Sequence, residues 1–368
     1  MKIDTLFMDH SLPLDDETDY LISKIHLEPQ RIRDSGEVYD FINHSDDPVS
    51  LAKKTLYITQ NKGALIRNCP GTCHYTCCDY TILHTGTFCT MDCSYCILQA
   101  YFHPPVLQYF AGFEPVRQAL QAVFLGNKIF RIGTGEYTDS LIWEKVSLMP
   151  EFLVKTFAGQ KNSVLELKTK TVNIESLLSL DHNEKTIIAW SLNTPEIIRS
   201  QERGTASLTA RLEAARQAEL KGYRLAFHFD PIVIYPGCEE QYKKVIQKIF
   251  EYVRPETIVW ISLGTFRFMP GLKSIMEKRF PASTLCYGEF IPGLDNKMRY
   301  FKPLRIHMYK EMIAGLKAYA PDVFLYFCME DEEIWEKCLG FFPGKDGELG
   351  RLLDRSAAGH CSLNTTFL

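Results

Sequence analysis

The stretch Cys89-Thr90-Met91-Asp92-Cys93-Ser94-Tyr95-Cys96 places three cysteines within eight residues. It follows a short apolar run, Tyr80–His84, and a four-residue turn. Three thiols so close in sequence can turn inward together where the backbone forms a loop. Three thiolates can bind three irons of a [4Fe–4S] cube and leave the fourth iron without a protein ligand. A closed zinc site needs a fourth ligand from elsewhere, for which His84 and His103 are near in sequence.

From residue 80 onward, short apolar runs alternate with segments long enough for helices. Such runs are typical of parallel strands that are covered on both faces. The predicted strands are Tyr80–His84, Lys128–Gly133, Val164–Thr169, Thr186–Leu192, Arg224–Val233 and Thr257–Gly264. The predicted helices are Glu114–Leu125, Leu141–Phe157, Ile174–Leu180, Ser207–Lys221, Glu239–Val253 and Gly271–Phe280. Six β–α units predict a parallel α/β barrel, complete or partial. The alternative is a doubly wound open sheet, which the missing G-x-G-x-x-G motif disfavours.

The two ends of the chain predict additions to one catalytic domain. Residues 1–50 carry twelve acidic and four basic side chains, which favours a solvated, loosely structured lead-in. The tail predicts a strand, Val323–Cys328, a helix, Glu332–Leu339, and a polar end. We therefore expect an N-terminal extension with a cysteine-rich loop at 1–79, a barrel at 80–285, and a C-terminal extension at 286–368.

Composition excludes several classes of protein. A 368-residue chain with 46% hydrophobic and 23% charged residues is neither disordered nor fibrous. Its apolar runs are too short to cross a bilayer, and the first ten residues do not form a signal peptide, so we expect a cytoplasmic protein without a membrane partner. In that reducing compartment, twelve cysteines are better explained as metal ligands or reactive thiols than as disulfides.

Charge is distributed unevenly along the chain. The net charge of −4 argues against a generally cationic nucleic-acid binder. Residues 264–317, however, carry ten basic and four acidic side chains, with aromatic residues between them. Such a segment could hold phosphates and stack bases, which makes a nucleic acid a possible substrate partner. The alternative is a solvated helix face beside a strand edge.

The spacing C-x3-C-x2-C, with an aromatic residue before the last cysteine, resembles the signature of radical S-adenosylmethionine enzymes. This resemblance implies a [4Fe–4S] cluster held by Cys89, Cys93 and Cys96, whose open iron binds S-adenosylmethionine. An electron then breaks the sulfonium C–S bond and leaves a 5′-deoxyadenosyl radical. The electron implies a reductant such as flavodoxin or ferredoxin, and the protein must shield the radical from water.

Further segments between residues 80 and 310 resemble the spore photoproduct lyase family, a radical-SAM group that reverses a thymine–thymine lesion in DNA. The resembling elements are Cys96-Ile97-Leu98-Gln99, Thr169-Lys170, Ser191-Leu192-Asn193, Glu202-Arg203-Gly204-Thr205, Arg211-Leu212-Glu213-Ala214-Ala215, Gly222-Tyr223, Pro231-Ile232, Gly237-Cys238-Glu239-Glu240, Phe266-Arg267-Phe268 and Arg279-Phe280-Pro281. The implied fold is a partial (β/α)6 barrel of TIM type with the cluster at its open top.

The resemblance also implies contacts to the cofactor. Tyr95 matches the aromatic residue at the adenine edge, and Asp230 matches a backbone contact to the adenine. Thr138, Lys170 and Ser191 fall where the family places polar contacts to S-adenosylmethionine. Glu136, after Gly135, resembles the acid that binds the methionine ammonium in many radical-SAM enzymes.

Two positions depart from the family pattern. Glu136 stands where the family has a cysteine that donates a hydrogen atom, and a carboxylate O–H is a poor hydrogen-atom donor. Ile97 stands where the family has a tyrosine of the radical relay. The resemblance therefore implies radical chemistry, while the substrate stays open. The alternative from another class is a non-catalytic, metal-stabilised protein that binds nucleic acid.

Other residues are candidates for separate roles. Cys69, Cys73, Cys77 and Cys78 could hold a second metal site, or form a cysteine-rich loop packed under the cluster. Five single thiols could each donate hydrogen or be structural: Cys238, Cys286, Cys328, Cys338 and Cys361. Cys238 is the best catalytic candidate because it follows a predicted strand end. His228 could point into the barrel as a functional group or be a hydrogen-bonded core residue.

Overall fold

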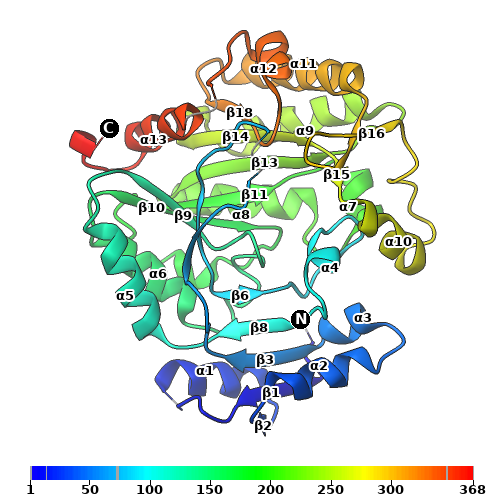
Figure 1. The fold of residues 1–368 in the computed structure, drawn as a ribbon. Helices are drawn as coiled ribbons and strands as arrows, with labels where there is room; N and C mark the ends of the chain where they lie inside the picture. The colour runs from blue at the N-terminus through cyan, green and yellow to red at the C-terminus, as the bar shows by residue number, and fades with distance from the viewer. Residues whose placement is uncertain (1, 14, 72–73, 345–346, 368) are drawn as a thin grey trace.

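The computed structural model describes residues 2–13, 15–71, 74–344 and 347–367, which build two large sheets, two small ones and the covering helices (Figure 1). The larger sheet has eight strands in the order β18-β14-β13-β11-β10-β9-β5-β4. Its bounds are β4 Ile66–Asn68, β5 Thr81–Leu83, β9 Phe130–Gly133, β10 Ser163–Thr169, β11 Thr186–Ser191, β13 Arg224–Ile232, β14 Ile258–Thr265 and β18 Leu325–Phe327. All neighbours pair in parallel except β4 and β5. The curled sheet confirms the predicted partial barrel.

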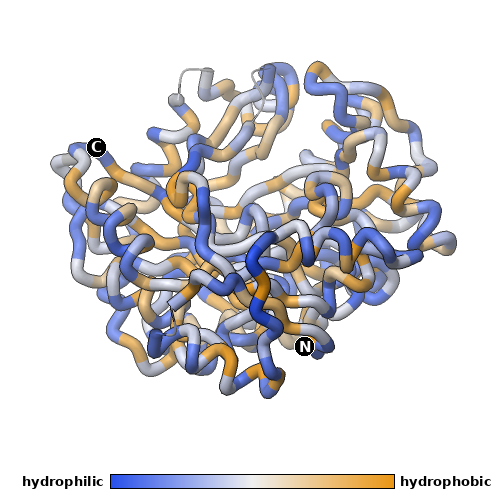
Figure 2. Tube along the Cα trace, turned by 60° about the horizontal axis from the view of Figure 1, so that its bottom comes forward, coloured by the Kyte–Doolittle hydropathy of each residue, from blue (hydrophilic) through white to orange (hydrophobic). Residues whose placement is uncertain are grey.

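The predicted strands are all present because their apolar runs are buried on both faces. Every residue of β11 is buried, and so is every residue of β14. The covering helices are α5 Phe113–Phe124, α6 Met149–Ala158, α7 Pro195–Gln201, α8 Leu208–Leu220, α9 Cys238–Tyr252, α10 Pro270–Arg279 and α11 Lys302–Tyr319. Figure 2 shows hydrophobic and hydrophilic residues alternating along the outer segments, as expected for helices with one buried face.

Two predicted helices are shorter in the structure. The segment 141–148 forms turns, and α6 begins only at Met149. Pro150 explains the start, because proline suits the first turn of a helix, where its missing N–H removes no hydrogen bond. Ile174–Leu180 contains only the 3-10 turn Glu175–Leu177.

The prediction of a loosely structured N-terminal lead-in is wrong. Residues 5–59 form β1 Thr5–Asp9, α1 Asp16–Ile25, β2 Gln30–Ile32, α2 Ser35–Asn43, α3 Pro48–Ala52 and β3 Thr55–Thr59. Three of the acids that suggested solvation instead cap helices: Asp15, Asp34 and Asp47 each accept a backbone N–H at an N-terminus. Carboxylates there satisfy free N–H groups and complement the helix dipole.

The N-terminal strands join a second sheet, in the order β2-β1-β3-β8-β6. Its last two strands, β8 Leu107–Phe110 and β6 Gly86–Thr87, come from beyond residue 80. The N-terminal layer, shown in blue in Figure 1, therefore continues into the segments that flank the three cysteines. Division of the chain at residues 79/80 and 285/286 stays a prediction.

The remaining short elements surround the barrel opening. They are β7 Asp92–Cys93, α4 Leu98–Tyr101, β12 Glu202–Arg203, β15 Arg267–Phe268, β16 Phe290–Pro292 and β17 Met298–Tyr300. The tail confirms the predicted strand as β18 and the predicted helix as α12 Glu332–Leu339, followed by the unpredicted α13 Glu348–His360. In the described part of the chain, no helix has both the length and the apolar character needed to span a bilayer.

A buried ion pair connects α13 to the barrel. Arg131 of β9 donates from Nε to Asp354 Oδ1 at 2.7 Å and from Nη2 to the carbonyl of Cys78 at 2.6 Å. The Arg131 side chain is only 5% exposed, so removal of its partner leaves a buried cation without a counterion. Such losses are strongly destabilising.

We expect Asp354→Asn to lower the free energy of unfolding by about 3 kcal/mol, because the Arg131 cation loses its carboxylate. Chemical denaturation of the full chain measures the change. Glu348→Gln is the matched control, since Glu348 pairs with Arg351 on an exposed face of α13 and should change stability by less than about 0.5 kcal/mol. An equal effect of the two substitutions would contradict the role of this pair.

Candidate functional site

A cavity of about 780 Å³ opens at the carboxyl ends of the barrel strands. Parallel strands bring their carboxyl ends to one edge, where barrel enzymes place their active sites. Part of the cavity lining follows β9, ends β10 and β11, and lies near the ends of β13 and β14; the cysteine motif and residues 294–297 supply further lining. All nine residues predicted for the cluster and the cofactor line it: Cys89, Cys93, Tyr95, Cys96, Glu136, Thr138, Lys170, Ser191 and Asp230.

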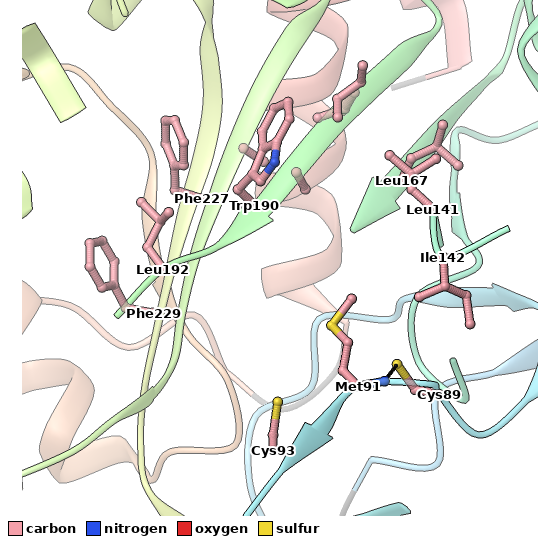
Figure 3. Packing of buried hydrophobic residues seen from close by; sticks show 14 of the residues in the cluster. Cys89, Met91, Cys93, Leu141, Ile142, Leu167, Trp190, Leu192, Phe227 and Phe229 are labelled. Carbon is pink, nitrogen blue, oxygen red and sulfur yellow. Dashed lines mark hydrogen bonds between the residues drawn. The ribbon is translucent and has the colours of Figure 1, made fainter. Parts of the chain in front are cut away.

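The three thiols of the motif face this cavity from the loop that ends at α4. Figure 3 shows Cys89 and Cys93 beside Met91, whose backbone N–H donates to Cys89 Sγ at 3.4 Å. Burial raises the pKa of the Cys93 thiol to about 12 and also raises the pKa of Cys89. Binding of a metal to these thiols therefore requires that they lose their protons.

A [4Fe–4S] cluster fits this arrangement of donors. Within the described ranges, no three His, Cys, Asp or Glu side chains converge closely enough to hold one metal ion. A cube does not need that convergence, because each thiolate binds a different iron. The three thiols share one wall of a cavity whose volume also leaves room for a bound organic ligand.

The cluster loop is held in place by hydrogen bonds within the chain. Gln99 of α4 donates from Nε2 to the carbonyls of Cys93 and Ser94, both at 3.1 Å. Residues 92–93 form β7, which pairs with β12 at Glu202–Arg203. The loop is thus held both by its own helix and by the segment that follows α7.

A buried carboxylate, Glu202, organises one side of the cavity. Its Oε1 lies 3.2 Å from Lys170 Nζ and accepts from the Tyr95 hydroxyl, while Oε2 accepts from Arg211 at 2.5 Å. Burial alone would raise the pKa of Glu202, but the Lys170 and Arg211 cations outweigh it, and with hydrogen bonds from Tyr95 and Arg211 they lower the pKa to about 2. Arg211 is fully buried, so its guanidinium is committed to this ion pair.

Sequence analysis missed the organising role of Glu202 and Asp139. Asp139 accepts from the backbone N–H of Leu141 and Lys170 and from the Thr169 hydroxyl, and so joins the loop after β9 to the end of β10. Both carboxylates contact residues distant in sequence. Only the match of Glu202 to a family element signalled its importance.

The cavity presents charges of both signs and one free hydroxyl. Glu136 Oε2 lies 3.7 Å from Lys168 Nζ, and Asp230 Oδ2 lies 3.1 Å from Arg267 Nη2. Thr138 Oγ1 is buried and has no hydrogen-bond partner among the described residues. An unsatisfied buried hydroxyl is costly unless a ligand completes it. This set suits a ligand that carries both an ammonium and a carboxylate, as the methionine part of S-adenosylmethionine does.

The predicted catalytic candidates Cys238 and His228 are not among the described residues that line the cavity. Cys238 begins α9 and is buried against Met308 of α11, with 3.9 Å between the two sulfurs. The chain turns away from the barrel opening between β13 and α9, which carries the thiol under α11. Among the single thiols, Cys328 Sγ lies 3.7 Å from Nη2 of Arg267, which lines the cavity.

His228 belongs to a polar network in the barrel core. Its Nε2 lies 2.8 Å from Glu166 Oε1, its Nδ1 lies 2.6 Å from Ser262 Oγ, and Trp260 Nε1 donates to Glu166 at 3.2 Å. Burial alone would raise the pKa of Glu166. The His228 charge and hydrogen bond, with Lys168 and Tyr80, outweigh burial and lower the pKa to about 2.

A carboxylate whose pKa is lower in the folded chain than in the unfolded chain stabilises the fold at pH values above the unfolded pKa. This stabilisation is lost as the pH falls through the folded pKa. For Glu166, the window runs from the ordinary pKa of 4.5 down to about 2. We expect about 3 kcal/mol of stability to disappear across this window in the wild type. In Glu166→Gln this acid-dependent loss should be smaller, with lower stability at pH 7.

Denaturation followed by tryptophan fluorescence at several pH values measures the effect, because Trp260 contacts Glu166. Glu151→Gln is the control, since Glu151 forms a solvent-facing helix pair with Lys155. If Glu166→Gln and the wild type lose stability in parallel between pH 5 and pH 2, the assignment of a depressed pKa to Glu166 is wrong.

The second cysteine group forms a packed loop beside the cavity. Cys69 and Cys78 pack against Tyr80, Ile82 and Tyr137. A hydrogen bond with Cys78 lowers the pKa of Cys77 to about 6, whereas burial raises the pKa of Cys69 to about 12. Cys73 lies outside the described residues. A second metal site on this loop stays a prediction.

The predicted basic segment, 264–317, is largely neutralised by ion pairs. Seven of its ten cations lie within 4.0 Å of a carboxylate: Arg267, Lys273, Arg279, Lys297, Arg299, Lys302 and Arg305. Net charge therefore overstates the free positive surface. The segment instead contributes Met269 and residues 294–297 to the cavity lining.

Comparisons with known proteins point to one family. The family model described as Spore photoproduct lyase matches residues 46–301, which is well over half of the chain and includes all nine predicted site residues. A spore photoproduct lyase from Clostridium acetobutylicum is 28% identical over 165 residues, covering 45% of this chain and 47% of that protein. One from Bacillus subtilis is 26% identical over 229 residues, covering 59% and 63%. The chain thus matches less than two thirds of the length of each relative.

Solved structures of spore photoproduct lyase share the fold. One single-residue variant superposes with a TM-score of 0.78 at 20% identity, covering 88% of this chain and 98% of the other. A double mutant with bound AdoMet and dinucleoside spore photoproduct gives a TM-score of 0.76 over the same shares. At this identity the likeness establishes the curled α/β barrel.

Proposed function

This chain belongs to the spore photoproduct lyase family, a radical-SAM group, and we propose that it cleaves S-adenosylmethionine in the cavity at the carboxyl ends of its barrel strands. One observation carries the proposal: nine residues chosen from the sequence for cluster and cofactor binding line the same cavity. They come from five separate places between residues 89 and 230. A scaffold that only binds metal has no need of this set.

Cys89, Cys93 and Cys96 would hold the [4Fe–4S] cluster as thiolates. When bound, the cluster supplies the electron that breaks the sulfonium bond and so produces the 5′-deoxyadenosyl radical. The buried loop and the hydrophobic side chains around Cys89 and Cys93 keep water from this region. We propose a one-electron protein donor such as flavodoxin or ferredoxin as the reductant, in a cytoplasmic setting that keeps the thiols reduced.

The cofactor would be oriented by groups of matching charge. Glu136 would accept the methionine ammonium, and Lys170 and Ser191 would offer polar contacts, with Lys170 kept in place by Glu202. The unpaired hydroxyl of Thr138 would form a hydrogen bond to the cofactor. The backbone of Asp230 would contact the adenine, and Tyr95 would pack at the adenine edge. The pairing of Glu136 with Lys168 shows that the carboxylate can reach a cation from this loop.

For the substrate we propose a lyase-like reaction on a nucleic acid or nucleotide that begins with hydrogen abstraction. A related structure was solved with a dinucleoside spore photoproduct, which makes that lesion the first substrate to test. Glu136 and Ile97 occupy the positions predicted for a hydrogen-donating cysteine and a relay tyrosine, so the return of hydrogen must use another group. The non-catalytic alternative loses support because most cations of residues 264–317 are already paired.

The test uses the full chain purified without oxygen. We expect about four irons per chain and release of 5′-deoxyadenosine after reduction with S-adenosylmethionine, with both lost in Cys93→Ala. Thermal unfolding of the variant without metal checks that it still folds. Zinc in place of iron, or an intact cluster that never cleaves S-adenosylmethionine, would contradict the proposal.

We expect Thr138→Val to weaken binding of S-adenosylmethionine about tenfold, because the methyl group of valine cannot form the hydrogen bond that the unpaired Thr138 hydroxyl offers to the cofactor. Anaerobic titration calorimetry of cluster-loaded protein measures the affinity. Thr186→Val is a matched control, since the Thr186 hydroxyl is likewise buried without a partner in the described structure. Thr186 begins β11, whereas the cavity is lined by Ser191 at the other end of that strand. Unchanged affinity in Thr138→Val would remove Thr138 from the cofactor contacts.

A further inference from the structure

Lys53 brings a buried positive charge from the N-terminal layer to the cluster loop. It follows α3 directly, and its side chain is only 7% exposed. Its Nζ donates to the carbonyl of Cys89 at 3.1 Å and to the carbonyl of Met91. The same ammonium lies 3.7 Å from Asp92 Oδ1 and 4.3 Å from the centre of the Phe88 ring.

All four contacts fall within residues 88–92, the segment that begins one residue before the first cluster cysteine and ends just before the second. A buried ammonium is expensive unless it is paired and hydrogen-bonded. Here its partners are two backbone carbonyls, one carboxylate and one aromatic face, all from the same five residues. The burial of Lys53 therefore fixes the path of the loop between Cys89 and Cys93.

The charge of Lys53 is only partly cancelled by Asp92. Arg279 of α10 also donates to Asp92 Oδ1, from Nη1 and Nη2 at 3.1 Å each. Two cations thus share the one carboxylate of the loop, while the second acid near Arg279, Asp47, is half exposed. Two cations therefore face two carboxylates behind the cluster loop, and the charge of Asp47 is better screened by water than the buried charge of Lys53.

We propose that Lys53 is a positioning residue that both fastens the cluster loop and raises the reduction potential of the bound cluster. This inference rests on the cluster site proposed above. Reduction adds one negative charge to the cluster, and a nearby buried cation stabilises that charge more than the same cation would in water. Net charge and hydrogen bonding around the thiolates are among the factors that set the potential of an iron–sulfur cluster.

The experiment is a redox titration of the reconstituted full chain without oxygen, followed by electron paramagnetic resonance of the reduced cluster. In Lys53→Met, we expect the ratio of reduced to oxidised cluster at a fixed potential to fall on the order of tenfold. Lys53→Arg keeps the charge and should stay close to the wild type. Asp92→Asn removes the neutralising carboxylate, so its potential should rise.

The opposite signs of Lys53→Met and Asp92→Asn separate charge from looseness, because a merely loosened loop would not move the potential in opposite directions. Lys185→Met is the matched control: Lys185 is also buried, but it precedes β11, at the opposite end of that strand from Ser191, which lines the cavity. It should leave the potential unchanged.

Each outcome decides the inference. The inference is overturned if Lys53→Met holds a full cluster whose reduction potential is unchanged. It is also overturned if the potential shifts in the same direction in Lys53→Met and Asp92→Asn. If Lys53→Met takes up no iron, the measurement on Asp92→Asn alone tests the inference. An unchanged reduction potential of the cluster in Asp92→Asn then overturns the role of charge near the cluster loop. Absence of iron from the wild type would instead refute the proposed cluster site itself.

Discussion

The buried carboxylate of Glu202 connects the parts of the site that come from separate segments. It binds Tyr95 of the cluster loop, Lys170 at the end of β10 and Arg211 of α8. Arg211 also donates to the carbonyl of Ser191 at the end of β11. Because a buried carboxylate that loses a cation is strongly destabilising, these four elements are held in a fixed relation. The cavity is thus shaped before a cofactor enters it.

A second constraint comes from outside the barrel. Lys53 and Arg279 reach the cluster loop from α3 and α10, which lie far apart in sequence. The N-terminal layer is therefore part of the site's architecture, because it shares a sheet with β8 and β6 and supplies a buried cation. The dense ion pairing of residues 264–317 belongs to the same pattern, in which charges hold backbone in place around the opening.

The barrel could be predicted because its strands are buried on both faces, which leaves a continuous apolar run in each. The N-terminal layer could not, because its acids were counted as solvated charge, whereas Asp15, Asp34 and Asp47 act as helix caps. The helix α13 was hidden by its polar face, although Leu349 and Leu353 are buried.

The candidate site was predictable where a short motif or a strand end marks it, as for Cys89 or Lys170. Groups that act through long-range contacts gave weak signals: Glu202 was marked only by a family element, and Lys53 was found only in the folded chain. Cys238 was predicted to lie at the active face because it follows a strand end in the sequence, but the structure does not place it among the residues that line the cavity. Distance along the chain fixes where an element begins, whereas the direction of a side chain depends on tertiary packing.

The most direct measurement of the central claim is a crystal structure of the reconstituted protein with S-adenosylmethionine, using diffraction data at the iron absorption edge. The account predicts iron peaks beside the sulfurs of Cys89, Cys93 and Cys96, with the cofactor in contact with Glu136 and Thr138. A single metal ion at these thiols, or the cofactor bound elsewhere with this cavity empty, would contradict it.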